Sequence, residues 1–459
     1  MSEQKPHFRD ELRPMLHLAA PLVFAELSWM AMAFVDTIMV GRMPDSAVAI
    51  GAVSIASVTF YAVAILGSGT LLGLDTLVSQ AFGALQIEEC HAALLDGMYI
   101  SIALTPILMG LLEFGCVPLW RYIGIDPVIL REAIPYLNTL NWSLLPLFVY
   151  FGARRYLQGM NLVKPVMFAM ISANLVNLVG NWMFIYGHLG APKMGVVGSG
   201  WSTCVSRVYM AGVLLGYIAY HDRRYKTGLR HIRLQPHFLR IKKLLHLGLP
   251  AGLQMTLEVG VFAAATALVA KLDPVSLAAH QIALNMASIT YMVPLGISSA
   301  AAVRVGQAIG RRDAHGAIHA GWSAIAIGSA FMTCAALAFL LVPRWIARIY
   351  TPDQAVIHTA VSLLAVAAAF QLFDGLQVVT TGALRGAGET HVPMVTNLIS
   401  YWFLGLPVGA YLCFSLHWGA IGMWAGLCIG LVLIGSILLW VWHRKVQQVE
   451  NLFSAPQSR

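Results

Sequence analysis

Long apolar runs recur along the whole chain and constrain its fold more than any other feature. Each run has roughly 20 residues, the length that a helix needs to cross a ~30 Å hydrocarbon layer. Only 11% of the 459 residues are charged and 58% are hydrophobic, whereas a soluble domain carries about 25% charged residues. The pattern therefore predicts an all-α integral membrane protein. Its twelve predicted transmembrane helices span 15–40, 47–74, 93–118, 131–153, 164–187, 196–220, 244–270, 276–303, 316–342, 355–381, 393–415 and 419–442.

An internal repeat divides these helices into two groups of six. A shift of 229 positions aligns Leu16–Pro21 with Leu245–Pro250, and a shift of 227 aligns Gln80–Gly83 with Gln307–Gly310. Because six is even, both groups begin on the same side of the membrane, which makes the repeat parallel. Transporters with parallel repeats bind substrate between the halves, near the bilayer midplane. We predict two pseudo-symmetric six-helix lobes at 1–220 and 244–443, a basic linker at 221–243 and a tail at 444–459.

Lysine and arginine collect on one predicted side of the membrane. Their densest stretch, from Arg223 to Lys243, lies in the linker, on the side where the alternation of helices also places both termini. Because cytoplasmic loops carry the excess of Lys and Arg, we expect a multi-pass protein of the cytoplasmic (inner) membrane with both termini cytoplasmic. We interpret the linker as a topology signal that contacts anionic lipid, not as a nucleic-acid site. The protein is expected to act as a monomer.

Five acidic residues fall inside the predicted spans, where a charge costs about 2.5–3.5 kcal/mol at the bilayer centre. They are Glu26, Asp36, Asp75, Glu258 and Asp374. Arg207 is the only basic residue predicted deep in a span, so most of these acids should lack a basic partner. An unpaired carboxylate in apolar surroundings attracts cations, as a cation-coupled carrier requires. We predict that Glu258, Asp374 and Asp36 bind the coupling ion, with Na⁺ possible at the first two; the roles of Glu26 and Asp75 stay open.

Polar and aromatic residues at helical spacing accompany these acids. Gln254 and Phe262 lie four residues before and after Glu258 and so share its helical face. Phe370 precedes Asp374 by the same spacing. In the first half, two asparagines four residues apart could supply amide oxygens beside Asp36, although transmembrane asparagines also connect helices. The predicted lining residues for a secondary cation or the substrate are Asn177, Asn181, Gln254, Phe262, Gln281, Asn285 and Phe370, and a structural role is equally open for the asparagines and for Gln281.

Six short segments, in order along the chain, carry a further pattern. They are FVDTIMVG around Asp36, GLDTLVSQAFGA around Asp75, LVNLVGNWMFIYG around Asn177 and Asn181, LEVGVFA around Glu258, AAHQIALN around Gln281, and FQLFDGLQVV followed by LRGAGET around Asp374. Together they resemble the multidrug and toxic compound extrusion (MATE) family, most closely its NorM branch, over nearly the whole chain.

This resemblance implies two six-helix lobes that form a V-shaped chamber. It also implies efflux of organic cations, such as drugs or dyes, in exchange for inward Na⁺ or H⁺, with functional acids at Asp36, Glu258 and Asp374. Phe370 stands where the NorM branch usually has tyrosine, which removes one possible oxygen ligand beside Asp374. No organic cofactor is expected, and Na⁺ or H⁺ is the coupling ion.

Other functions fit the sequence less well. A lipid-linked oligosaccharide flippase, the main alternative, would need Arg and Lys in its interior to hold an anionic substrate, whereas this interior is acidic. HExxH, GxSxG and P-loop patterns do not occur in the sequence, so an enzyme is not predicted. The residues do not discriminate Na⁺ from H⁺, and they do not define the range of drugs.

Overall fold

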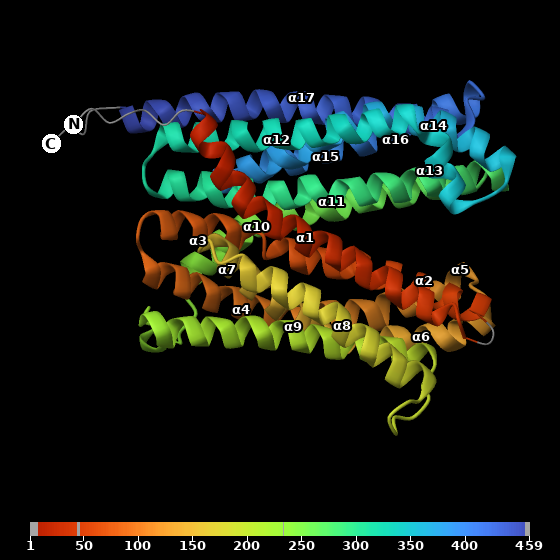
Figure 1. Cartoon of the computed structure of the whole chain (residues 1–459), viewed down its shortest axis with the longest axis horizontal. Coiled ribbons are helices and arrows are strands. Elements are labelled where there is room, and N and C mark those ends of the chain that lie inside the picture. The colour runs from red at the N-terminus through yellow and green to blue at the C-terminus, as the bar shows by residue number, and fades with distance from the viewer. Residues whose placement is uncertain (1–7, 44–45, 233, 455–459) are drawn as a thin grey trace. The chain divides into compact units, whose positions relative to one another are not determined.

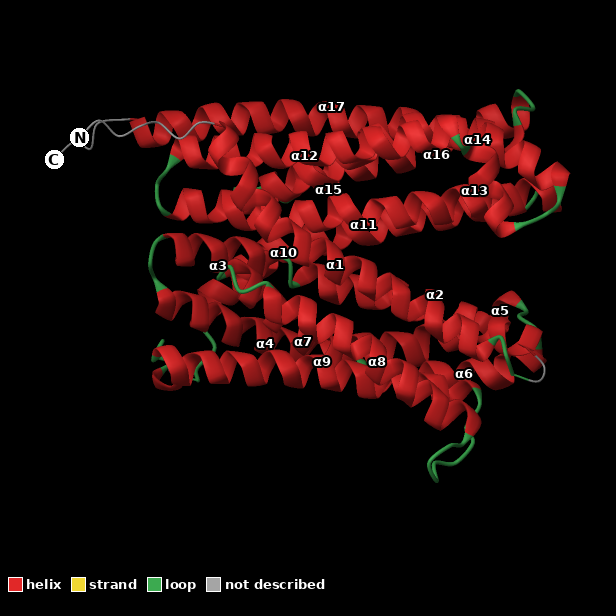
Figure 2. Cartoon of the chain, viewed as in Figure 1, coloured by secondary structure: helices red, strands yellow, loops and turns green. Residues whose placement is uncertain are grey.

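The computed structural model describes residues 8–43, 46–232 and 234–454, and nearly all of them are helical (Figures 1 and 2). This part of the chain contains no strand. A helix satisfies its own backbone hydrogen bonds, as an apolar membrane requires, and the predicted all-α membrane fold is confirmed. The α-helices are α1 (Phe8–Val40), α2 (Ser46–Thr70), α3 (Gly73–Gly83), α4 (Ile87–Gly110), α5 (Val117–Ile123), α6 (Pro127–Trp142), α7 (Leu144–Gly159), α8 (Lys164–Tyr186), α9 (Val196–Tyr225), α10 (Phe238–Val269), α11 (Pro274–Gly310), α12 (Ala314–Leu341), α13 (Pro343–Tyr350), α14 (Gln354–Gly386), α15 (His391–Asn397), α16 (Leu406–Ala410) and α17 (Gly419–Ser454).

Among the described residues, eleven helical stretches are long and apolar enough to cross a membrane. They match eleven of the twelve predicted spans. The remaining prediction, 131–153, falls on α6 and α7, two helices of 16 residues each that meet at Ser143. This predicted span is therefore an interrupted helix. Its second part also continues past the predicted end, to Gly159, and so extends the helix through Arg154 and Arg155.

The chain folds into two compact units. We call residues 24–252 the N-terminal unit, and residues 1–23 together with 253–459 the C-terminal unit. The predicted boundary in the linker at 221–243 differs from this division, which falls inside α1 and α10. Each of these helices begins in one unit and ends in the other.

Close packing explains why the division falls inside the helices. In the C-terminal unit, Gly296 approaches Val23 so closely that a Cβ on the glycine would lie 2.6 Å from Val23 Cγ2. In the N-terminal unit, Gly248 lies against Thr70, and an added Cβ would lie 1.7 Å from the Thr70 carbonyl oxygen. The start of α1 thus packs with the second half of the chain, and the start of α10 with the first half.

The N-terminal unit has a continuous apolar core that runs from α1 to the start of α10. In it, α8 packs along α9, α2 along α6, and α7 against both α4 and α9 (Figure 1). Phe60, Phe148 and Tyr150 are fully buried between these helices. The α7 helix is therefore central, and its polar residues are held inside the unit.

In the C-terminal unit, α14 occupies the centre. It packs against α11, α12 and α17, which run beside it (Figure 1). The unit also contains two π-helical segments. Leu398–Gly405 connects the short helices α15 and α16, and Tyr411–Ser415 lies between α16 and α17. A π-helix displaces side chains from their usual α-helical positions and often occurs at functional sites.

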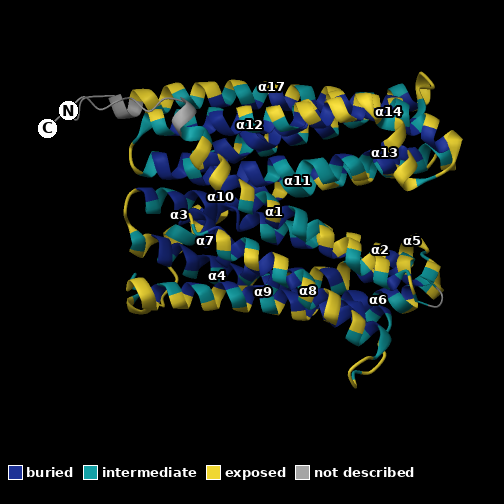
Figure 3. Cartoon of the chain, in the orientation of Figure 1, coloured by how far each residue is buried: buried dark blue, intermediate teal, exposed yellow. Residues whose placement is uncertain are grey.

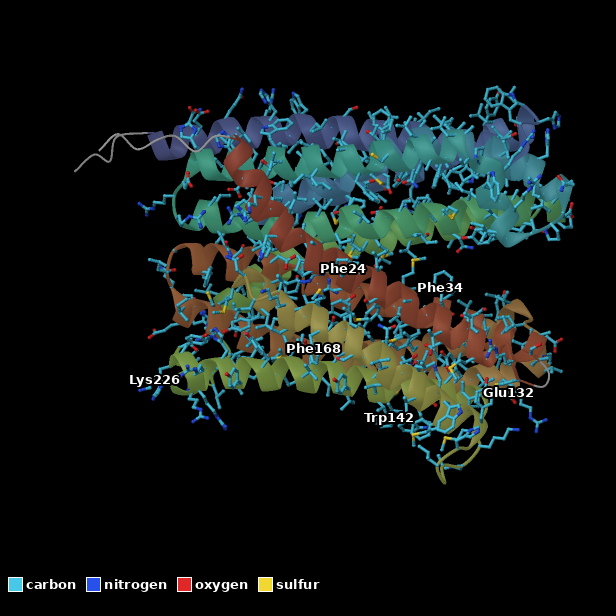
Figure 4. The ribbon with its side chains drawn as sticks, viewed as in Figure 1. Phe24, Phe34, Glu132, Trp142, Phe168 and Lys226 are labelled. Atoms are coloured by element: carbon cyan, nitrogen blue, oxygen red, sulfur yellow. The ribbon has the colours of Figure 1, made fainter. Side chains whose placement is uncertain are left out.

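Large apolar side chains also cover outer faces of the helices, as expected for surfaces in contact with lipid. Figure 3 shows helices such as α12 and α17 with buried and exposed faces. Phe24, Phe168 and Trp142, labelled in Figure 4, are 57%, 61% and 70% exposed. Exposed aromatic residues of this size are typical of a membrane protein and unusual in a soluble one.

Candidate functional site

Glu258 lies on the part of α10 that belongs to the C-terminal unit, and only 9% of its surface is exposed. Its Oε2 accepts hydrogen bonds from Gln377 Nε2 (3.4 Å) and Asn397 Nδ2 (3.5 Å). These partners come from α14 and α15, so three helices meet at the carboxylate. Both bonds are long, and the protein therefore stabilises the ionised carboxylate only weakly.

Asp374, on α14, is 4% exposed and accepts no hydrogen bond from any residue that the structure describes. It lies within electrostatic range of Glu258, and the two carboxylates repel each other. Neither acid pairs with a basic side chain in the described ranges 8–43, 46–232 and 234–454. Two buried like charges without a basic partner need a proton or a bound cation to be stable in apolar surroundings.

An aromatic cluster lies on the same helices as these acids. Phe262 and Phe370 meet edge to face, with ring centroids 5.9 Å apart. Phe262 also contacts Tyr401 at 6.0 Å, and Phe370 contacts Trp424 at 5.6 Å. The two predicted phenylalanines are thus brought together, one turn from Glu258 and Asp374 respectively. Aromatic faces of this kind attract organic cations.

Tyr401 adds a hydroxyl group that the sequence analysis did not identify. The side chain is fully buried in the π-helical segment Leu398–Gly405, and its hydroxyl has no hydrogen-bond partner among the described residues. It interacts electrostatically with Glu258 and Asp374. The side-chain oxygens of Gln377 and Asn397 are also buried without a partner in the described part of the chain. The unit therefore offers neutral oxygen atoms near the acids even though Phe370 provides none.

Not all of the predicted lining residues contact Glu258 or Asp374. Gln254 is buried, but Gln281 and Asn285 are exposed on α11, and neither is hydrogen-bonded to the acids within the described chain. Their neighbour His280 is fully buried instead. It accepts a hydrogen bond from Trp424 Nε1 at its Nδ1 (3.0 Å), so its Nε2 carries the proton and donates to Thr266 Oγ1 (2.9 Å).

In the N-terminal unit, Asp36 lies in a polar cluster. Its Oδ1 accepts a hydrogen bond from Asn181 Nδ2 (2.6 Å), and Asn181 Nδ2 also contacts Asn177 Oδ1 (3.2 Å). The Thr203 hydroxyl donates to Asp36 Oδ2 (3.4 Å). The structure thus brings together the three predicted residues and adds Thr203, which only the Ser/Thr-rich segment GSGWSTCVS could have indicated.

Arg207 lies one turn beyond Thr203 on α9 and is 2% exposed. Its guanidinium donates hydrogen bonds to Ser143 Oγ and to Tyr61 Oη (3.3 Å), and it lies 4.7 Å from the centre of the Phe60 ring. The hydroxyl of Ser143, at the break between α6 and α7, therefore holds a buried cation.

Glu26 and Asp75, whose roles the sequence left open, both have a basic partner. Glu26 forms an ion pair with Arg154, and both side chains are buried. Asp75 pairs with Arg155, with 3.4 Å between Oδ2 and Nη1. The predicted span ended before these arginines, but α7 continues through them, and both side chains are buried within the unit.

A sequence profile of the MatE family matches residues 21–183 and 250–411, more than half of the chain. The chain belongs to the MatE family. The two matches begin 229 positions apart, the same offset that aligns the internal repeat. This MatE protein therefore contains the family unit twice.

Curated relatives place the protein near the NorM branch. A probable multidrug resistance protein NorM from Mesorhizobium japonicum is 34% identical to this MatE protein over 447 residues, covering 95% of each chain. Its counterpart from Rhodopseudomonas palustris is 35% identical over 449 residues, covering 95% of this chain and 92% of the relative. The resemblance seen in the motifs is thereby confirmed.

Solved structures share the fold at lower sequence identity. The crystal structure of a eukaryotic MATE transporter, AtDTX14, aligns with a TM-score of 0.86 at 20% identity, covering 97% of this MatE protein and 99% of that chain. A MOP superfamily transporter from Pyrococcus furiosus aligns with a TM-score of 0.81 at 20% identity, covering 98% and 100%.

Proposed function

We propose that this MatE protein is a multidrug efflux transporter that exchanges organic cations from the cell for inward Na⁺ or H⁺. One observation carries the proposal. Glu258 and Asp374 are buried on helices that also carry the aromatic cluster, repel each other, and have no basic partner in the described chain. The names of the NorM relatives support drugs as the substrates.

The carboxylates favour a cation, and the aromatic cluster favours an organic one. A buried carboxylate needs a positive charge or a proton to offset its lost hydration. The Phe262 and Phe370 rings add apolar contact and cation–π attraction for a bulky, partly apolar cation. A small ion lacks the apolar contact that the rings offer a bulky cation, so the two ligand classes share the carboxylates but differ in their other contacts.

The exchange of drug for coupling ion follows because both bind the same carboxylates. Because drug and coupling ion both neutralise the same acids, each weakens the binding of the other, and the coupling is reciprocal. Na⁺ would be held by carboxylate oxygens together with neutral oxygens such as those of Gln377, Asn397 and Tyr401, whereas H⁺ needs only a carboxylate. We propose that Asp36 contributes through the N-terminal unit, that the protein works as a monomer in the inner membrane, and that it is not an enzyme.

Reconstituted protein tests the proposal. Proteoliposomes loaded with a fluorescent cation such as ethidium receive either a Na⁺ gradient or a pH gradient, each imposed alone. Efflux driven by at least one gradient supports exchange, and the responding gradient identifies the coupling ion. Liposomes containing the Glu258→Gln/Asp374→Asn double variant are the matched control. Equal efflux with and without both gradients would overturn the proposal.

A further inference from the structure

His280 is a fully buried side chain on α11, and both of its ring nitrogens have hydrogen-bond partners on other helices. Its Nδ1 accepts a hydrogen bond from Trp424 Nε1 on α17 (3.0 Å), and its Nε2 lies 2.9 Å from Thr266 Oγ1 on α10. Both distances are those of well-formed hydrogen bonds. The imidazole thus joins three helices of the C-terminal unit.

Only one protonation state of the imidazole satisfies both bonds. The indole N–H of tryptophan can only donate, so Nδ1 carries no proton and the single proton of a neutral ring lies on Nε2. The Thr266 hydroxyl then accepts this N–H and donates its own hydrogen to the Phe262 carbonyl oxygen (2.9 Å). The hydrogen bonds therefore run in one direction, from Trp424 through His280 and Thr266 to the backbone of Phe262.

Ring contacts connect the two ends of this series of hydrogen bonds. Trp424 meets Phe370 edge to face, with ring centroids 5.6 Å apart, and Phe370 meets Phe262 in the same way at 5.9 Å. Hydrogen bonds and ring contacts together close a loop through α10, α11, α17 and α14. Edge-to-face pairs depend on the angle between the rings, so a change in the position of one ring should alter the orientation of the next.

Phe262 is the most accessible of these three rings. Trp424 and Phe370 are 0% and 2% exposed, whereas Phe262 is partly exposed. It also lies one turn from Glu258 on the same helical face, so a bulky cation attracted to that carboxylate meets the Phe262 ring first. Because cation–π attraction requires the cation to lie over the face of the ring, the orientation of Phe262 should affect drug binding.

We propose that His280 is a positioning residue for drug binding. Through Trp424 and Thr266 it holds the Phe262 ring in the orientation that contacts a bulky organic cation. This inference deepens the proposed function and rests on it. His280 touches neither the drug nor the coupling ion in this scheme, so its loss should weaken drug binding without altering the response to the ion.

Two substitutions of His280 separate its hydrogen bonds from its bulk. A glutamine amide carries an acceptor and a donor side by side, so His280→Gln can keep both bonds. His280→Phe keeps a ring but offers neither group, and it leaves the buried N–H of Trp424 without its acceptor. Because an unpaired buried donor is unfavourable, the indole should move to find another partner and thereby change its contact with Phe370.

Ethidium efflux from proteoliposomes, measured over a range of ethidium concentrations, tests the proposal. We expect His280→Phe to raise the KM for ethidium about three- to tenfold. The maximal rate, and the coupling-ion concentration that gives half-maximal efflux, should both stay close to the wild-type values, whereas a general loss of structure would lower the maximal rate. His280→Gln should restore most of the affinity for ethidium. An unchanged KM in His280→Phe, or equal defects in both variants, would overturn the proposal.

Thr266→Val tests the same connection without removing the acceptor of the buried indole. It replaces the hydroxyl that accepts from His280 by a methyl group, and the KM for ethidium should again rise. Thr333→Val on α12 is the matched control, because its exposed hydroxyl donates to its own helix, at Ser329 O (2.7 Å); its KM should not change. Fluorescence polarisation of ethidium with the purified proteins should give the same order of affinities. If Thr266→Val behaves like Thr333→Val, the proposal is wrong, whereas failure of the wild-type protein to pump would refute the proposed function.

Discussion

Glu258→Gln and Asp374→Asn, made singly, remove one buried negative charge while keeping the size of the side chain. In Glu258→Gln, the amides of Gln377 and Asn397 still meet a carbonyl oxygen. The two native bonds are 3.4 and 3.5 Å long, so even their full loss would cost at most about 0.5–1.5 kcal/mol each. Against this, a neutral amide is easier to bury than a carboxylate, and the repulsion between the acids disappears. We expect normal membrane levels and an unchanged or higher melting temperature.

Efflux should fall in these variants, although their stability is unchanged or higher. If drug and ion compete for the pair of carboxylates, removing either one weakens the competition that couples the two fluxes. We expect ion-driven efflux to fall at least roughly tenfold, equivalent to about 1.4 kcal/mol of coupling. A more stable protein that pumps less is the signature of a functional site, because a purely structural acid would lower both quantities together.

The assay is ethidium efflux from proteoliposomes with protein amounts matched by immunoblot. Asp353→Asn is the control, since it makes the same chemical change at the start of α14, where the Asp353 side chain accepts a hydrogen bond from Ala355 N (2.9 Å) and asparagine caps equally well. It should pump at the wild-type rate. If Glu258→Gln and Asp374→Asn both express normally and also pump within about twofold of wild type, these acids are not the coupling site.

Four further outcomes are expected. Tyr401→Phe removes a hydroxyl without a hydrogen-bond partner in the described chain, so the melting temperature should not change; weaker Na⁺ stimulation of efflux would identify the hydroxyl as a ligand, and unchanged stimulation would exclude it. Glu26→Gln leaves Arg154 buried and unpaired, at a cost of about 3–5 kcal/mol, so its melting temperature should fall and recover in Glu26→Gln/Arg154→Gln; a stable single variant would contradict the buried pair. Cells that overproduce the protein should accumulate less ethidium, and equal protection against anionic compounds of similar size would contradict the acidic site. A reporter active only in the periplasm and fused after Arg459 should be silent, and strong activity would overturn the predicted topology.

Local sequence patterns predicted those parts of the site that lie within one helix. Asn177 and Asn181 are four residues apart, and the structure places both in the Asp36 cluster. Phe262 and Phe370 lie one turn from their acids and meet across two helices. Helical periodicity places residues correctly when the partners share a face, because the spacing alone decides which side chains are neighbours.

The remaining parts depended on information that periodicity does not contain. Gln377 and Asn397 reach Glu258 from segments more than a hundred positions away, and only the packed fold brings them together. On α11 the apolar residues are spread nearly uniformly around the helix, so the pattern did not show that His280 is buried and Gln281 is exposed. The pairing of Arg154 with Glu26 was missed because the apolar run was taken to end where α7 in fact continues.

The division of α1 and α10 between the two units sets the order in which the protein can be completed during its synthesis. The contact between Val23 and Gly296 cannot form until about 270 further residues have left the ribosome, some tens of seconds at about 5–20 residues per second. During that interval the start of α1 lies in the membrane without its native neighbours on α11. The first half of the chain likewise lacks its contact with the start of α10 until that segment has been synthesised. Two separately made halves of this protein would therefore each lack a packing segment that only the other half encodes.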